Sequence, residues 1–113
     1  MKEIKAYIKP YKLSELTLVL HQVKGLTGMS VTDVRGFGHT RSMDARHRTI
    51  DDLDDYVPHV KIEIVCRDEL AEKLISIIAE AAHTGLHGDG KIYVTEITDA
   101  VRISTGQRGE EAV

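Results

Sequence analysis

Two hydrophobic spacings alternate along the first quarter of the chain. In KEIKAYI (Lys2–Ile8) every second residue is apolar, which predicts a strand with one buried face. The spacing then becomes helical, with apolar residues at Leu13, Leu16, Leu20 and Val23. Gly25 is suited to end this helix. The pattern therefore predicts a strand followed by an amphipathic helix.

The same order returns later in the chain. MSVTDVRG (residues 29–36) is short and rich in β-branched residues, which favours a strand, and VPHVKIEIVC (residues 57–66) alternates cleanly. Asp68 is placed to cap a second helix. The apolar stripe of this helix consists of Leu70, Leu74, Ile77, Ile78 and Ala81. KIYVTEITDAVRI (residues 91–103) predicts a last strand with a bend near Asp99.

The resulting order, β-α-β-β-α-β, is that of the ferredoxin-like fold, in the α+β class. Both helices should cover one face of a four-stranded antiparallel sheet. Isoleucine and valine also occur on both sides of some strands, so the other face needs a cover, and a symmetric oligomer is the simplest one. A length of 113 residues suits one domain, spanning residues 1–113.

Composition narrows the classes of function. Hydrophobic residues make up 42% and charged residues 29%, as in soluble globular proteins. The net charge of -3 argues against nucleic acid and anionic membranes as partners. The lone Cys66 leaves no internal disulfide and fits a reducing compartment. With no membrane-length apolar stretch and no signal-peptide pattern at the start, we expect a cytoplasmic protein that is not inserted in a membrane.

One connection is unusually long. Residues 37–56 show neither spacing, and structureless loops longer than about 12–15 residues are usually functional or disordered. The first half of the segment is basic and the second half acidic. This layout favours an interaction loop over a solvated loop with no role.

A glycine-rich stretch, TGLHGDGKI (residues 84–92), raises the question of a phosphate site. From Gly85 it reads Gly-x-x-x-x-Gly-Lys, as in a P-loop, but a P-loop continues with Ser or Thr and opens a helix. Here Ile92 follows and a strand pattern begins. Gly85 could instead cap a helix, with Asp89 and Gly90 forming a turn. Glycines at positive φ also build anion-binding nests, so the local residues leave both readings open.

Taken together, the segments resemble the PII signal-transduction family. MKEIKAYIKPYKL, GLTGMSVTDVRGFG, YVPHVKIEIV, TGLHGDGKIYV and VRISTG occur in the family's order and cover nearly the whole chain. The resemblance implies a ferredoxin-like homotrimer that binds ADP, AMP or ATP in clefts between subunits. It also implies a long T-loop, at about residues 37–56, that contacts target proteins. It leaves open whether a magnesium ion accompanies the nucleotide.

The resemblance also assigns residues to the nucleotide site. A phosphate-binding B-loop is implied at about residues 84–91, and a C-terminal segment at about residues 100–113 contributes Arg102. The B-loop residues are Gly88, Asp89, Gly90 and Lys91. The other nucleotide-binding positions are Ile8, Ser30, Gly36, Phe37, Gly38, Glu63, Val65 and Thr84.

Several positions depart from the family pattern. The family's uridylylated tyrosine corresponds to Asp52, and a serine that is phosphorylated in some relatives corresponds to Ile50. Usual basic phosphate contacts are replaced by His39, Leu86 and Ser104. At the base of the loop, Thr40 and His59 replace the glutamine and lysine that serve 2-oxoglutarate in relatives. His39, Thr40 and His59 are therefore candidate effector residues of a divergent branch outside ordinary nitrogen signalling.

For this branch we expect a target protein, with a membrane transporter preferred, bound through the T-loop. Its sizeable aliphatic residues, Met43, Ile50 and Leu53, are the candidate anchors. Bicarbonate is the leading second effector. The alternatives are a conventional nitrogen and carbon sensor responding to ATP and 2-oxoglutarate, or a metal-responsive relative.

Three other classes of function fit the residues less well. An RNA-recognition domain needs exposed aromatics and a basic face, but the chain has one Phe, no Trp and a negative charge. A metal chaperone is disfavoured because the chain has no Cys pair, and no metal site is expected. No nucleophile–base pair or magnesium-binding carboxylate cluster can be placed in the cleft, so we do not expect an enzyme.

Overall fold

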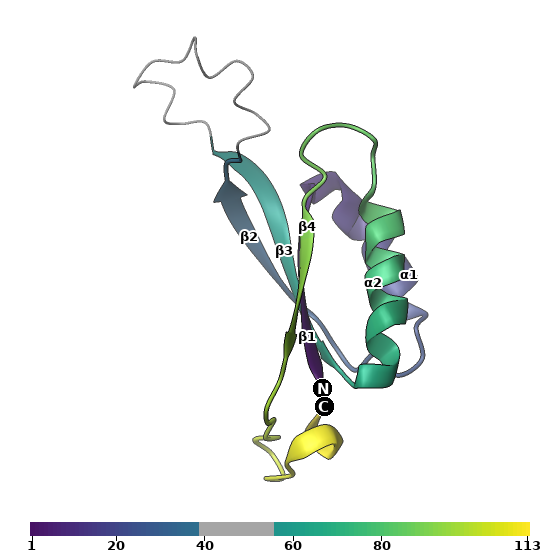
Figure 1. Ribbon diagram of the computed structural model, residues 1–113, viewed down its shortest axis with the longest axis vertical. Helices are drawn as coiled ribbons and strands as arrows, with labels where there is room; N and C mark the ends of the chain where they lie inside the picture. Colours follow the sequence, from purple (N-terminus) through teal and green to yellow (C-terminus); the bar gives the residue numbers. More distant parts are fainter. Residues whose placement is uncertain (39–55) are drawn as a thin grey trace.

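The computed structural model describes residues 1–38 and 56–113 (Figure 1). The elements in chain order are β1 (Lys2–Ile8), η1 (Pro10–Lys12), α1 (Leu13–His21), β2 (Ser30–Gly36), β3 (Val57–Cys66), α2 (Asp68–Ala82), β4 (Lys91–Glu96) and η4 (Gly109–Ala112). The strands form one antiparallel sheet in the order β2-β3-β1-β4, and α1 and α2 lie on one of its faces. The predicted ferredoxin-like order is confirmed.

Most of the predicted T-loop falls on residues that the structure does not describe. The candidate anchors Met43, Ile50 and Leu53 lie outside the described residues, as do His39 and Thr40. The described part of the loop region begins and ends with Phe37, Gly38 and Tyr56. The roles assigned to the segment stay predictions.

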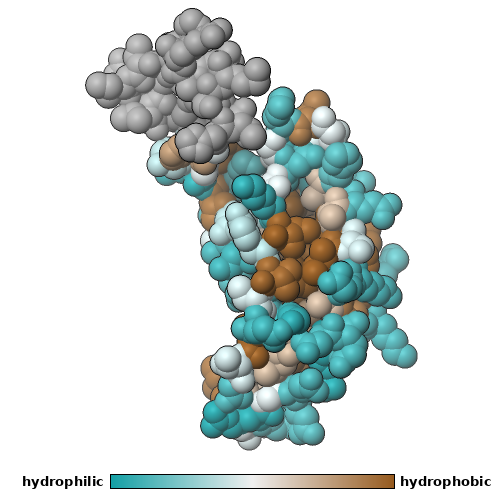
Figure 2. All heavy atoms as spheres, in the orientation of Figure 1, coloured by the Kyte–Doolittle hydropathy of each residue, from teal (hydrophilic) through white to brown (hydrophobic). Residues whose placement is uncertain are grey.

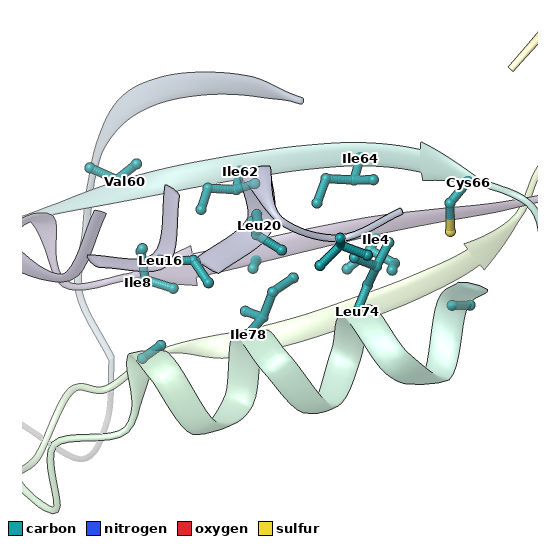
Figure 3. Packing of buried hydrophobic residues seen from close by; sticks show 14 residues of the cluster. Ile4, Ile8, Leu16, Leu20, Val60, Ile62, Ile64, Cys66, Leu74 and Ile78 are labelled. Atoms are coloured by element: carbon teal, nitrogen blue, oxygen red, sulfur yellow. The ribbon is translucent and has the colours of Figure 1, made fainter. Parts of the chain in front are cut away.

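The core lies between the helices and the two central strands (Figure 3). Alternation along β1 places Ile4, Ala6 and Ile8 on the helix face, where each is at most 1% exposed. The register then sets them opposite apolar residues of β3, because Ile4 pairs with Ile64 and Ile8 with Val60. The helices complete this core with Leu16, Leu20, Leu74 and Ile78.

The last strand is shorter than predicted. β4 ends at Glu96, whereas the pattern predicted a strand through Ile103. The register with β1 ends at the pair Lys2–Glu96, and the amide of Ile97 donates to the Met1 carbonyl at 3.0 Å. The chain then turns, and a single bridge joins Val101 to Arg108.

The predicted cap at Asp68 was wrong, and the cap at Gly85, which the sequence left open, does not form. Asp68 is the first residue of α2 and the cap is the extended Arg67. The Asp68 carboxylate instead accepts a hydrogen bond from the Met1 ammonium at 2.8 Å, which lowers the pKa of Asp68. At the other end α2 stops at Ala82, so Gly85 lies beyond the cap. The local pattern placed both caps within three residues of the observed ends of α2, but it did not show that Asp68 would contact Met1.

The open face of the sheet is more polar than predicted. The β1–β3 register puts Lys5 opposite Glu63 on this face, and Lys61 lies 3.3 Å from Glu63. Val31 and Val94, 43% and 42% exposed at the edge strands, pair with Ile62 and Ile4 and so belong to the helix face. Figure 2 shows apolar surface in the region of β4 and α2, bordered by hydrophilic side chains. Among the described residues, no helix has the length and apolar character needed to cross a membrane.

Replacing Leu74 with Ala should lower the free energy of unfolding by about 2–5 kcal/mol, because the fully buried side chain would leave a cavity between α2 and the sheet. The matched control is Leu18→Ala in α1, where the leucine is 68% exposed and the loss should stay below about 0.5 kcal/mol. Urea unfolding of both variants checks this, and equal losses would contradict the assigned core.

Candidate functional site

A cavity lies where one end of the sheet meets the loop between α2 and β4. Its volume is about 640 Å³, within the range of small-molecule sites. Its lining residues are Tyr7, Val34, Arg35, Gly36, Phe37, Gly38, His59, Gly88, Asp89, Gly90, Lys91 and Tyr93. The end of β2 therefore faces the glycine-rich loop across β3 and β1.

The conformation of the loop depends on its glycines. Gly85, Gly88 and Gly90 have φ values of 81°, 83° and 105°, which side-chain-bearing residues rarely adopt. Gly90 also passes close to β1, since a Cβ there would lie 1.6 Å from the Tyr7 carbonyl oxygen. The glycines thus permit a compact loop of the kind that can turn amides toward an anion.

Asp89 holds this loop together from inside. Its carboxylate accepts hydrogen bonds from the Thr84 hydroxyl, from the Thr84 amide at 2.9 Å and from the Gly85 amide at 3.3 Å. Lys9 Nζ lies 3.3 Å away and His83 Nδ1 lies 3.2 Å away. The Thr84 bonds, with Lys9 and Gly85, hold the pKa of Asp89 far below its ordinary value. The carboxylate is therefore occupied as a brace of the loop.

Lys9 was missed by the sequence reading. Its ammonium bridges Asp89 and the Thr84 hydroxyl, which it contacts at 3.1 Å, and its side chain is 16% exposed. This contact ties the end of β1 to a loop about 75 positions later, a separation that no local pattern spans. The pairing became predictable only once β1 and β4 were neighbours.

Two aromatic pairs were also missed. Tyr7 and Tyr93 meet edge to face on the open face of the sheet, with ring centroids 6.1 Å apart. Phe37 and Tyr56 meet in the same way at 5.3 Å, where β2 and β3 reach the undescribed segment. Alternation in β1 already pointed Tyr7 away from the core, which was the available signal.

The structure brings together only part of the predicted nucleotide site. Seven of its predicted residues line the cavity, as does the candidate effector residue His59; the seven are Gly36, Phe37, Gly38, Gly88, Asp89, Gly90 and Lys91. Thr84 lies behind them as a partner of Asp89. Ile8 is 1% exposed and belongs to the core, so its side chain is not available. The ligand itself stays a prediction.

Four other predicted residues lie outside the cavity within one chain. Ser30 pairs in register with Glu63, and Val65 lies two residues further along the same face of β3. Arg102 follows β4, which runs from Lys91 to Glu96 and carries the chain roughly 17 Å away at strand rise. Figure 1 shows the C-terminal segment at the end of the molecule opposite the α2–β4 loop. One chain alone therefore does not unite Lys91 with Arg102.

Metal ligands do not gather among residues 1–38 and 56–113, where no group of three or more His, Cys, Asp or Glu side chains could hold an ion. His83 and His87 have the spacing of a helical metal pair. Because α2 ends at Ala82, however, that spacing does not place them on one helical face.

Comparison with known proteins identifies the family. The sequence model described as Nitrogen regulatory protein P-II matches residues 1–107. The chain is 46% identical to the proteins of that name from Azospirillum brasilense and Rhodospirillum rubrum, over 113 residues and the full length of each. The chain belongs to the P-II family. A crystal structure of Arabidopsis thaliana PII bound to citrate is similar, with a TM-score of 0.80 and 35% identity, over 99% of this chain and 91% of that one.

Family membership confirms the resemblance drawn from the ordered motifs. It also makes the chain a regulatory protein of the P-II family. The matched region includes the glycine-rich loop and ends at Gln107, so it takes in Arg102. Ligand, effector and partner remain to be argued from this chain's own residues.

Replacing Gly90 with Ala should destabilise the protein by at least about 1–2 kcal/mol, because both the positive φ and the Tyr7 carbonyl exclude a Cβ. Gly28→Ala is the control, since nothing lies within 4 Å of a Cβ at that position. Chemical unfolding compares the two variants. Equal midpoints would mean that the loop is not held against β1.

Proposed function

We propose that this P-II family regulator binds an adenine nucleotide, ADP, AMP or ATP, with its phosphates against residues 88–91. The observation that carries this proposal is the cavity in which the positive-φ glycines and Lys91 face the end of β2. Lys91 and Arg35 supply cations to its wall. Asp89 is the acidic residue of the lining, and its carboxylate already accepts hydrogen bonds from the Thr84 and Gly85 amides. It therefore repels a bound anion less than a carboxylate without such bonds would.

The nucleotide lies between subunits of a homotrimer in this proposal. Ser30, Glu63, Val65 and Arg102 fall outside the cavity of one chain, which is expected if a neighbouring chain contributes them. Exposed apolar side chains on β4 and the C-terminal segment support such a neighbour, since Val94 is 42%, Val101 54% and Ile103 99% exposed. Burying surface of this kind favours association.

A small anion serves as second effector, with bicarbonate preferred over 2-oxoglutarate. His59, in place of the lysine of relatives, lines the cavity and contacts Gly88. The solved relative was bound to citrate, which supports anion binding in the family. Full-length identity to nitrogen regulatory proteins keeps 2-oxoglutarate as the rival, so calorimetry with each anion, with and without Mg²⁺, decides between them.

The target protein, preferably a membrane transporter, is bound through residues 37–56. Phe37 and Tyr56, 67% and 50% exposed, meet edge to face at the base of this segment, where its two ends come together. The base lies beside the cavity, which Phe37 also lines. Nucleotide in the cavity would therefore touch the same residues that orient the segment.

Lys91→Ala and Arg102→Ala should each weaken ADP binding by about tenfold or more, as expected for the loss of one charged hydrogen bond. Calorimetry measures the affinity, and Lys24→Ala, in the exposed turn after α1, is the control. If both variants bind as the wild type does, the site is wrong.

Mixing the two variant chains tests the trimer at the same time. Lys91 of one chain would face Arg102 of a neighbour, so each mixed trimer regains one intact cleft. High-affinity binding should return when the chains are refolded together. High-affinity binding would not return if Lys91 and Arg102 of the same chain formed the site. A monomer in light scattering would also refute the proposal.

Deleting residues 41–54 should leave nucleotide binding intact and abolish capture of the target, because the deletion removes the proposed anchors and spares the cavity lining. Calorimetry and pull-down from native lysate measure the two properties. A target retained by the shortened protein would place the interaction surface elsewhere.

A further inference from the structure

His59 connects the two walls of the cavity. It projects from β3 on the open face of the sheet, half-buried, opposite Val34 of β2 in the register. Its Nε2 lies 3.2 Å from the Gly88 carbonyl oxygen in the glycine-rich loop. Its Nδ1 lies 3.4 Å from the Val57 carbonyl oxygen in β3. Both ring nitrogens therefore face hydrogen-bond acceptors.

This arrangement distinguishes the protonation states of the ring. A neutral imidazole carries one N–H, so it can donate to one of the two carbonyls and leaves a lone pair facing the other. The imidazolium carries two and can donate to both. Hydrogen bonds from a charged donor are also stronger than neutral ones. Protonation of His59 should therefore tighten the contact between β3 and Gly88.

Several charged or titratable side chains surround His59. The titratable or charged side chains around His59 in the described residues are Tyr7, Arg35, Lys61, Asp89, Lys91 and Tyr93. His87 precedes Gly88 in the loop. Asp89 and Lys61 already have partners in Lys9 and Glu63. Arg35 and Lys91 are the remaining charged side chains of this wall, and both are cations that a bound phosphate would neutralise.

The Gly88 carbonyl also determines a peptide orientation. In a trans peptide the C=O and the following N–H point in opposite directions. With the carbonyl held toward His59, the Asp89 amide is directed to the other side. A carbonyl lining the cavity would repel phosphate, and a protonated His59 offsets that repulsion.

We propose that His59 is a proton-linked positioning residue that makes the phosphate loop bind anions more tightly as pH falls. The inference rests on the proposed nucleotide site, but the bond from His59 to Gly88 can be tested without ligand. Histidine side chains ordinarily change charge between about pH 5 and 8, which is the range to test.

In the free protein, the NMR shift of the Gly88 carbonyl carbon should follow the His59 ring signals as pH changes. In His59→Gln, which offers only a neutral donor, the Gly88 signal should lose that dependence. His21→Gln, in the last turn of α1, should behave as the wild type does. A Gly88 signal that ignores His59 overturns the inference, whether or not nucleotide binds.

With ligand, ADP affinity relative to His59→Gln should rise by about fivefold between about pH 8 and pH 6. His59→Lys keeps a positive charge throughout and should bind well at both pH values. The charge on ADP changes with pH equally for every variant, so the comparison isolates the contribution of His59 to the pH dependence. The variant His87→Gln measures the contribution of the neighbouring histidine. Parallel pH profiles for wild type and His59→Gln refute the inference. A different result would be that neither the wild type nor any variant binds ADP at either pH, while the Gly88 signal still follows His59. That result refutes the nucleotide site but not the hydrogen bond between His59 and Gly88.

Discussion

The close approach of Gly90 to the Tyr7 carbonyl is the constraint on which the site depends. Antiparallel pairing of β1 and β4 brings the loop over the end of β1, and no side chain fits between the two backbones. Once this contact forms, Lys9 reaches Asp89 and Thr84, and Lys91 enters the cavity beside Tyr7. The position of the glycine-rich loop is thus a consequence of strand register.

The core secures that register. On the helix face, Ile4, Ala6 and Ile8 are almost completely buried, and a shift of β1 by one residue would exchange them for Glu3, Lys5 and Tyr7. Burial of apolar side chains dominates folding free energy, whereas burying a charge is costly. The interior therefore fixes which side chains of β1 face the cavity.

Rigid and adaptable parts meet at this cavity. Its floor is sheet backbone held by neighbouring strands on both sides, while its rim consists of a loop tied by side-chain bonds to Asp89 and by His59. A regulator needs such a junction, because a ligand can bias a segment only if it binds two arrangements unequally. The Phe37–Tyr56 pair stands at the same junction, where β2 and β3 lead into residues 39–55.

By itself, the sequence determined the elements, their order and the family. Alternation in residues 2–8 and 57–66 and helical spacing around Leu74 are local properties, and burial energetics convert them directly into strands and a helix. The glycines at positions 85, 88 and 90 also indicated backbone angles that other residues rarely adopt. Ordered motifs spread over the whole chain identified the P-II family.

Only the tertiary structure decided where those residues meet. It ended β4 at Glu96, which is the partner of Lys2 in the register, and it drew Asp68 away from its cap. It tied Asp89 to the Thr84 amide within the loop, and it gave His59 two carbonyl partners. It also separated Arg102 from Lys91 within one chain. The pairs Met1–Asp68 and His59–Gly88 join residues far apart in sequence, and the geometry between such residues is set by packing of the whole sheet, which local spacing does not encode.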